Sequence, residues 1–282
     1  MPRIACFVLA ACGSSAQQPT PTPAPTAPIA AHDAAAAPTL SPELKARWSH
    51  GCFLVRLASG LVETNHATCS QPRRPYSTFK LANALIGLDA GVLEGAESPM
   101  PWDKRAVPDE KQFRDEWRKP HTLRSAIKVS AVPQFRTLAR TLGEKRMAAG
   151  LAKLGYGNQN IGGGIDLFWL RGGLRISAAE QLAFVDALAH GKLAVTPHAQ
   201  EVVRDISVLE RRGSRVLHGK TGSGMAEDGS GKFLVWQVGW VEDGTQIVPY
   251  AAWLEVTGGT FDDARAARDA LLRDSFAALG VF

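Results

Sequence analysis

A serine and a lysine stand three residues apart in the segment Ser77-Thr78-Phe79-Lys80, and apolar residues at helical spacing follow it. Residues three apart share one face of a helix, so the lysine amine reaches the serine hydroxyl. A serine hydroxyl is a weak nucleophile that needs a base beside it. The free N–H groups at a helix N-terminus also suit a developing oxyanion. Because such tetrads are common by chance, this one makes Ser77 only a candidate nucleophile.

Two further short motifs carry polar side chains that suit a cleft. Lys220-Thr221-Gly222 lies on an expected strand before a glycine-rich turn, and Ser130-Ala131-Val132 lies in an expected turn between two helices. A strand edge pairs with an extended amide substrate, and a lysine binds a carboxylate. Each motif alone is also what chance produces, so only their combination is informative.

The elements that must position these motifs follow from apolar spacing and capping residues. Strands are expected over 53–57 and 62–67 around a turn, and again over 215–219, 233–242 and 248–256. Helices are expected after Ser77, over 122–128, from Pro133 to Gly143, up to Gly155, after Ser177, after Thr196 and over 262–279. This order predicts an α+β fold, in which a central antiparallel sheet built from both ends of the chain is flanked by helices and carries a largely helical inserted subdomain.

Taken together and in this order, the motifs resemble those of the penicillin-recognising serine enzyme superfamily and, within it, the class D (oxacillinase-type) β-lactamases. The resemblance covers roughly residues 43–282. The Tyr-Gly-Asn element and the Ser-x-Val triplet separate class D from class A, and the class A glutamate loop has no convincing counterpart. The matching segments are 77–80, Ser130-Ala131-Val132, Tyr156-Gly157-Asn158, GGGIDLFWL at 162–170, Lys220-Thr221-Gly222 and VGWVE at 238–242.

The resemblance implies hydrolysis of β-lactams through an acyl-enzyme on Ser77. Without a glutamate, one base must act in both acylation and deacylation, and an ammonium lysine with a reference pKa near ~10.4 does not serve. Burial beside Phe79, Val132 and Trp169 favours the neutral amine. A neutral amine adds CO2, and the resemblance implies that Lys80 does so to become N6-carboxylysine. CO2 or bicarbonate is then the only expected requirement, with no other cofactor and no metal.

The resemblance also assigns the remaining roles. Ser130 relays a proton to the departing β-lactam nitrogen, Lys220 keeps that relay electropositive, and the backbone N–H groups of Ser77 and Ser223 form the oxyanion hole. The indole of Trp169 donates to the carbamate, with core packing as the alternative interpretation. The expected substrate-binding residues are Thr221, Gly222, Ser223 and Arg265, where Arg265 binds the substrate carboxylate unless it is simply an exposed arginine of the last helix. The expected supporting residues are Val132, Trp169, Tyr156 and Asn158.

Two other functions would use the same fold. One is a penicillin-binding sensor or transpeptidase-like protein, which acylates without turnover and would show burst acylation alone. The other is an envelope lipoprotein that keeps the fold only for binding. The intact set of Ser77, Lys80, Ser130 and Lys220 counts against the second.

The composition and charge argue against a nucleic-acid-binding protein. The chain has 282 residues, of which 45% are hydrophobic and 21% charged, and a net charge of +5 spread along its length. It lacks the basic run or face that nucleic-acid binding needs, and its seven histidines show no metal-ligand spacing. The partners that the resemblance implies are β-lactams, and no nucleic acid is expected.

The N-terminus reads as a targeting segment. Residues 1–11 have the positive start and short apolar run of a secretory signal, and Leu9-Ala10-Ala11-Cys12 resembles the bacterial lipoprotein box. Cys12 is thus a candidate for lipidation, with a plain signal and a chance cysteine as the alternative. Residues 12–42 read as the lipid-attachment cysteine and a Pro/Ala/Thr-rich linker, and 43–282 as the catalytic domain. We expect an exported, periplasmic protein that touches a bacterial membrane only through a lipid anchor.

Two cysteines of the folded part are placed for a bridge. Cys52 and Cys69 lie equally far from the middle of the first expected turn, so antiparallel pairing would set them opposite each other. Exported chains meet an oxidising compartment. We therefore expect a Cys52–Cys69 disulfide, with two buried free thiols as the alternative.

Overall fold

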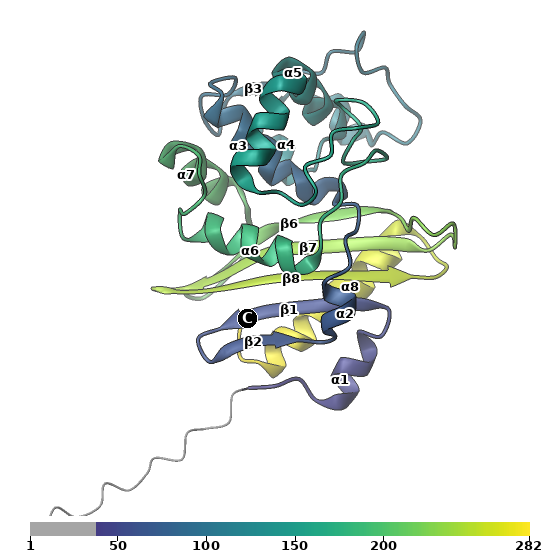
Figure 1. Cartoon of the computed structure of the whole chain (residues 1–282), viewed down its shortest axis with the longest axis vertical. Coiled ribbons are helices and arrows are strands. Elements are labelled where there is room, and N and C mark those ends of the chain that lie inside the picture. The colour runs from purple at the N-terminus through teal and green to yellow at the C-terminus, as the bar shows by residue number, and fades with distance from the viewer. Residues whose placement is uncertain (1–37) are drawn as a thin grey trace, which may run out of the picture. The chain divides into compact units, whose positions relative to one another are not determined.

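A six-stranded antiparallel sheet lies at the centre of the computed structural model, which describes residues 38–282 (Figure 1). Its spatial order is β2-β1-β8-β7-β6-β5. The strands are β1 Gly51–Leu57, β2 Gly60–Glu63, β5 Val208–Arg212, β6 Arg215–Met225, β7 Phe233–Asp243 and β8 Gln246–Val256. Strands from both ends of the chain thus lie side by side, which confirms the predicted α+β architecture.

Helices cover both faces of the sheet. One face packs on α8, Phe261–Ala278, and the other on α6, Ala178–Ala189. The alternation of side chains along β1 shows the two cores, because Phe53 belongs to the core under α8 and Leu54 to the core under the helical region. The remaining helices of that region are α3 Lys80–Asp89, α4 Leu123–Lys128, α5 Val132–Leu154 and α7 Pro197–Ile206.

The folded domain begins before residue 43, where the sequence placed its start. Leu40 is 3% exposed and belongs to the core under α8, and the side chain of Ser41 accepts a hydrogen bond from the Leu44 N–H to cap α1, Pro42–Arg47. The linker therefore ends earlier than predicted, because an apolar side chain just before the cap is buried. The signal segment, Cys12 and the linker up to residue 37 lie outside the described residues.

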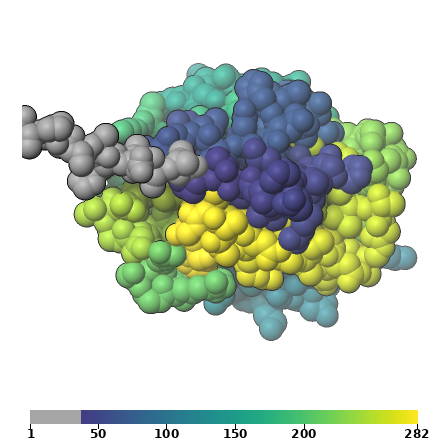
Figure 2. All heavy atoms as spheres, turned by 90° about the horizontal axis from the view of Figure 1, so that it is seen from below, coloured from purple at the N-terminus to yellow at the C-terminus, as the bar shows by residue number. Residues whose placement is uncertain are grey.

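The start of the described chain packs against its end. Trp48 donates from Nε1 to the Ser275 hydroxyl at 3.1 Å, and Arg47 pairs with Asp274 at 2.7 Å. Figure 2 shows the purple N-terminal helix α1 directly beside the yellow C-terminal residues. Within residues 38–282, no helix is long and apolar enough to cross a membrane.

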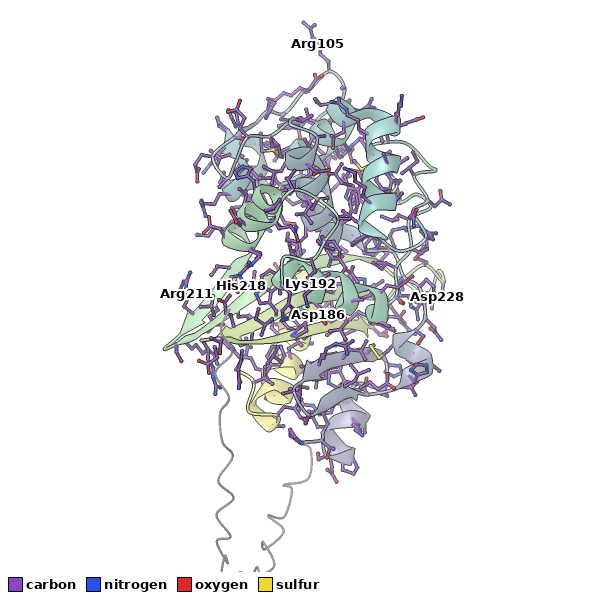
Figure 3. The ribbon with its side chains drawn as sticks, turned by 60° about the vertical axis from the view of Figure 1, so that its left-hand side comes forward. Arg105, Asp186, Lys192, Arg211, His218 and Asp228 are labelled. Atoms are coloured by element: carbon purple, nitrogen blue, oxygen red, sulfur yellow. A yellow bond between two sulfur atoms is a disulfide. The ribbon has the colours of Figure 1, made fainter. Side chains whose placement is uncertain are left out.

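The expected second strand is wrong in its last part. β2 ends at Glu63, and Asn65 then caps a short helix, α2 His66–Cys69, by accepting a hydrogen bond from the Thr68 N–H at 2.9 Å. The structure contains the Cys52–Cys69 disulfide, drawn as a yellow bond in Figure 3, but it joins β1 to a helix and does not cross a hairpin. A polar cap outcompetes strand pairing at this point because it satisfies free helical N–H groups.

The capping signals elsewhere predicted helix starts correctly. Ser177 and Glu180 form the capping box of α6, and Thr196 caps α7 before Pro197. The two helices expected on either side of Gly143 are both present within α5 and meet at a kink, where Gly143 leaves helical geometry with a φ of 73°. A glycine tolerates this conformation, so the helix resumes after it.

Candidate active site

Ser77 lies on a short 3-10 helix, Tyr76–Phe79, directly before α3. Tyr76 has a φ of 50°, which is uncommon for a residue with a side chain. Its N–H donates to the Trp169 carbonyl at 3.2 Å, and its hydroxyl donates to the Met225 carbonyl. Contacts from two distant segments therefore hold the strained backbone beside Ser77.

Lys80 joins the two serines predicted to react. Its Nζ donates to Ser77 Oγ at 2.7 Å and lies 3.2 Å from Ser130 Oγ. The side chain is completely buried. Burial, and then the charge of Lys220, lower the pKa of Lys80 well below its usual range. The amine is thus poised to be neutral beside the nucleophile.

Ser130 occupies the turn between α4 and α5. Its φ is 57°, and its N–H donates to the Ile127 carbonyl at 3.1 Å, so a tight turn presents the hydroxyl to Lys80. Val132 follows as the first residue of α5 and lines the cleft. The Ser130-Ala131-Val132 triplet therefore lies in a turn between two helices, as predicted.

Strand β6 forms the opposite wall. A side chain at Gly222 would place its Cβ 2.7 Å from the Pro75 carbonyl oxygen and 3.2 Å from the Thr78 nitrogen. Only a glycine permits this approach, which brings Thr221 and Ser223 to the cleft next to Ser77.

Lys220 is buried on the same strand. Its Nζ donates to the Thr221 carbonyl at 3.1 Å, and the structure shows no direct contact between this amine and Ser130. Burial, followed by the charges of Arg268 and Arg265, lowers the pKa of Lys220 to about 7. A small change in pH near neutrality thus alters the charge of this wall.

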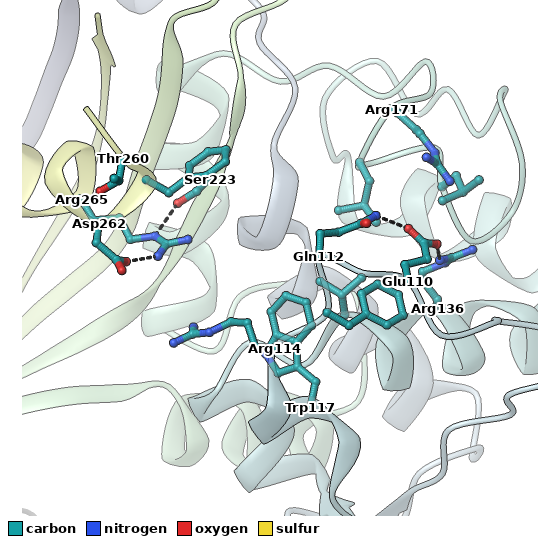
Figure 4. A pocket seen from close by; sticks show the side chains of 15 residues that line it. Glu110, Gln112, Arg114, Trp117, Arg136, Arg171, Ser223, Thr260, Asp262 and Arg265 are labelled. Atoms are coloured by element: carbon teal, nitrogen blue, oxygen red, sulfur yellow. Dashed lines mark hydrogen bonds and ion pairs between the residues drawn. The ribbon is translucent and has the colours of Figure 1, made fainter. Parts of the chain in front are cut away.

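Arg265 reaches the cleft from the first turns of α8. Its Nε donates to Ser223 Oγ at 3.1 Å, and its Nη1 pairs with Asp262 (Figure 4). The contact with Ser223 separates Arg265 from an ordinary exposed arginine of that helix. The guanidinium lies at the cavity that also holds Ser77 and Ser130.

Trp169 packs behind the nucleophile segment. Its ring centroid lies 5.1 Å from that of Phe79, and the residue is fully buried. Its Nε1 has no hydrogen-bond partner within residues 38–282. The same is true of the indoles of Trp240 and Trp253, so Trp169 differs from them only in packing against the nucleophile segment.

Tyr156 and Asn158 lie outside the cleft. Tyr156 is buried, and its hydroxyl accepts a hydrogen bond from Gln181 Nε2 at 3.2 Å, while the same nitrogen donates to Thr78 Oγ1 at 2.8 Å. Asn158 donates to the Gly173 carbonyl at 3.0 Å and accepts from the Arg175 N–H at 2.9 Å. The first therefore supports the Ser77 segment, and the second closes the base of the loop that carries Trp169.

The cleft consists of two adjoining cavities. A cavity of about 530 Å³ is lined by Ser77 and Ser130, and a second, of about 550 Å³, extends it toward Glu110 and Gln112 (Figure 4). Residues shared by both are Arg114, Trp117, Val132, Leu170, Ser223, Asp262 and Arg265.

Sequence reasoning missed part of these walls. Trp117 and Arg114 come from a loop of irregular structure, where no periodic pattern marks a side chain as facing a cavity. Leu170 belongs to the segment 162–170 that was singled out, yet its place in the cavity wall had no separate signal. Arg136, which also lines the second cavity, reads in the sequence as an ordinary polar position of a helix.

Comparison with known proteins gives one consistent result. Residues 34–273 match the family described as the penicillin binding protein transpeptidase domain. Beta-lactamase OXA-10 of Pseudomonas aeruginosa is 39% identical over 216 residues, covering 76% of this chain and 79% of the relative. Beta-lactamase OXA-48 of Klebsiella pneumoniae is 40% identical over 180 residues, covering 63% and 64%.

Solved structures agree with these relatives. FUS-1 (OXA-85), a class D beta-lactamase from Fusobacterium nucleatum subsp. polymorphum, superposes with a TM-score of 0.77 at 35% identity and covers 85% of this chain and 98% of its own. The class D beta lactamase YbXI from Nostoc gives a TM-score of 0.75 at 32% identity, with 85% and 99% covered.

Proposed function

Since the chain belongs to the class D serine β-lactamases, we propose that its hydrolysis of β-lactams passes through an acyl-enzyme on Ser77, with Lys80, carbamylated on Nζ, as the base. The observation that carries the proposal is the 2.7 Å contact between the buried Lys80 Nζ and Ser77 Oγ. A carboxylate formed on this nitrogen would lie next to the hydroxyl whose proton the base must take.

The residues at the cleft support the carbamate in two ways. Burial lowers the pKa of Lys80, and a neutral amine is the form that adds CO2 with loss of one proton. The unpartnered Nε1 of Trp169 is a donor that suits a carboxylate-like acceptor. When formed, the carbamate supplies one proton acceptor for both acylation and deacylation.

The two serines divide the acylation step. Ser77 Oγ forms a bond to the β-lactam carbonyl carbon, and the bond from that carbon to the lactam nitrogen breaks. The nitrogen takes up a proton from Ser130, whose Oγ lies 3.2 Å from Lys80 Nζ, and Ser130 regains a proton from the base that took the Ser77 proton. Water then adds to the acyl carbon, the ester bond breaks, and Ser77 regains its proton. The backbone N–H groups of Ser77 and Ser223 stabilise the oxyanion in both steps.

Residues of β6 and α8 bind the substrate. Arg265 and Lys220 attract the substrate carboxylate, and Arg265 is oriented by its hydrogen bond to Ser223. Thr221 and Ser223 lie along the cavity wall, and Gly222 allows that wall to approach the nucleophile segment.

Bicarbonate dependence tests the proposal. Purified protein freed of CO2 at mildly acidic pH should lose sustained nitrocefin hydrolysis, and added bicarbonate should restore it. Turnover that does not respond to bicarbonate anywhere between about pH 5 and 8 would contradict the carbamate. A single burst of acylation without turnover would contradict hydrolysis itself.

Export to the periplasm with lipid attachment at Cys12 is part of the same proposal. The Cys52–Cys69 disulfide supports it, because such bridges persist in oxidising compartments. Cell fractionation tests the anchor: Cys12→Ala should move the protein from the membrane to the soluble periplasmic fraction.

A further inference from the structure

Arg136 forms a buried ionic bridge at the edge of the cleft. It lies on α5, one turn after Val132, and its side chain is 6% exposed. Its Nε and Nη2 lie 3.0 and 2.9 Å from one oxygen of Asp166, and its Nη1 pairs with Glu110 (Figure 4). A guanidinium presents a planar set of donors that suits two carboxylates at once. The helix is thereby tied to two separate loops.

The first tie leads to the nucleophile. Asp166 precedes Trp169 by three residues in a tight turn, in which the Phe168 N–H donates to the Gly164 carbonyl at 2.9 Å. The carbonyl of Trp169 in turn accepts the 3.2 Å hydrogen bond from the Tyr76 N–H. Contiguous contacts therefore run from Arg136 through Asp166 to the residue before Ser77.

The second tie leads to the outer wall of the cleft. Glu110 belongs to the loop 101–120, which lies between the two-residue strands β3, Pro99–Met100, and β4, His121–Thr122, and holds one short 3-10 helix, Asp115–Arg118. This loop provides Phe113, Arg114 and Trp117 to the cavity. Because little regular structure holds it, its position depends on side-chain contacts such as the one to Arg136.

We propose that Arg136 is a positioning residue of the reaction, which sets the Trp169 turn against the Ser77–Lys80 pair through Asp166 and the 101–120 wall through Glu110. The inference rests on the proposed acyl-enzyme mechanism and deepens it. Small displacements of reacting groups by a distant change cost up to about a hundredfold in rate. Removing the bridge should therefore slow acylation beyond any loss of folded protein.

The chain offers a matched control. Arg140 also contacts Asp166, through Nε at 3.1 Å, but its side chain is 44% exposed. Arg140→Gln removes one charge from Asp166 and keeps the bridge to Glu110. Arg136→Met removes the bridge, and Arg136→Lys keeps the charge without the two-sided contact. Glu110→Gln loosens the loop alone.

Two measurements test the inference on whole protein. The acylation rate constant of Ser77 by benzylpenicillin, taken by quenched-flow mass spectrometry and normalised to titrated active sites, should fall about ten- to a hundredfold in Arg136→Met and less in Arg136→Lys. The bicarbonate concentration at which half of Lys80 is carbamylated, measured by NMR with ¹³C-bicarbonate, should rise severalfold in Arg136→Met.

In the control Arg140→Gln, both quantities should stay within about twofold of wild type. Glu110→Gln should raise KM for penicillins with bulky side chains and leave the acylation rate constant near wild type.

Several results would overturn the inference. One is a lower melting temperature in Arg136→Met with an unchanged acylation rate constant per active site. Another is a loss of acylation rate in Arg140→Gln as large as the loss in Arg136→Met. If Arg136→Met does not fold, the acylation rate constant and the bicarbonate dependence of Arg136→Lys test the inference instead. If the acylation rate of the wild type does not depend on bicarbonate, only the carbamate is contradicted, because the acylation rate constants of wild type and Arg136→Met can still be compared. No acylation in the wild type would overturn both.

Discussion

Lys80 on α3 and Lys220 on β6 are both buried, and after burial itself the charge of Lys220 is what most lowers the pKa of Lys80. Within residues 38–282 neither amine forms an ion pair with a carboxylate. Their titrations are therefore linked, and the pH profile of the enzyme reports on the pair as a whole.

The decrease of kcat/KM at alkaline pH should follow the deprotonation of Lys220. Burial lowers its pKa to about 7, so the amine is charged below that pH and neutral above it. Attraction for the substrate carboxylate then weakens as the pH rises. At saturating bicarbonate the carbamate anion on Lys80 favours the charged form of Lys220, so kcat/KM should decline on the alkaline side of pH 7. In Lys220→Arg the guanidinium stays charged, so the decline should disappear between pH 7 and 9. An identical decline in both proteins would assign it to another group.

Lys80→Ala should abolish the reaction in both half-steps. Among residues 38–282, Lys80 carries the one amine that hydrogen-bonds to both serines, so loss of the base should lower nitrocefin turnover by at least about 10³-fold. Lys192→Ala, an exposed lysine labelled in Figure 3, serves as the control and should match wild type. Normal turnover by Lys80→Ala would require a different base.

Gly222→Ala should separate β6 from the nucleophile segment. The new Cβ would lie 2.7 Å from the Pro75 carbonyl oxygen, so the strand must shift and kcat should fall by about one to two orders of magnitude. Gly95→Ala adds the same methyl group where nothing lies within 4 Å, and its kcat should not change. Steady-state kinetics on both variants make the comparison, and equal kcat values would show that the close approach is not needed.

The disulfide should affect stability but not catalysis. It closes a loop over a sequence separation of 17, for which chain entropy predicts a contribution of about 3 kcal/mol. Neither cysteine lines the cleft. The Cys52→Ala, Cys69→Ala double variant should therefore unfold at lower urea concentration and keep kcat within about twofold at 25 °C. A large drop in kcat of the folded variant would connect the bridge to the site.

Local signals in the sequence were reliable where a side chain acts on its own backbone. The capping box at Ser177 and the cap at Thr196 act within one turn of the chain, and both helices begin there. The reactive tetrad is equally local, since a three-residue spacing already sets Lys80 beside Ser77.

Contacts between segments that are distant in the sequence could not be predicted from local patterns. Strand β5 was missed because its sequence, VLERR, has no alternation and its side chains are mostly exposed at the sheet edge. The pair Arg136 and Asp166 has no sequence signature, because 30 residues separate the partners and each looks like an ordinary surface charge. The strained φ of Tyr76 likewise depends on partners from the Trp169 turn and from Met225.

The pairing of β1 with β8 sets an order of events during biosynthesis. Cys52 lies opposite Trp253 in that pairing, about 200 residues later in the chain, and Gly222 must reach Pro75 before the Ser77 segment takes its final shape. A ribosome that has made only the first two thirds of the chain has produced Lys80 and Ser130 but not yet β6, the strand that approaches the reactive serine. In the proposed mechanism, acylation of Ser77 must therefore wait until β6 has been made and has paired into the sheet.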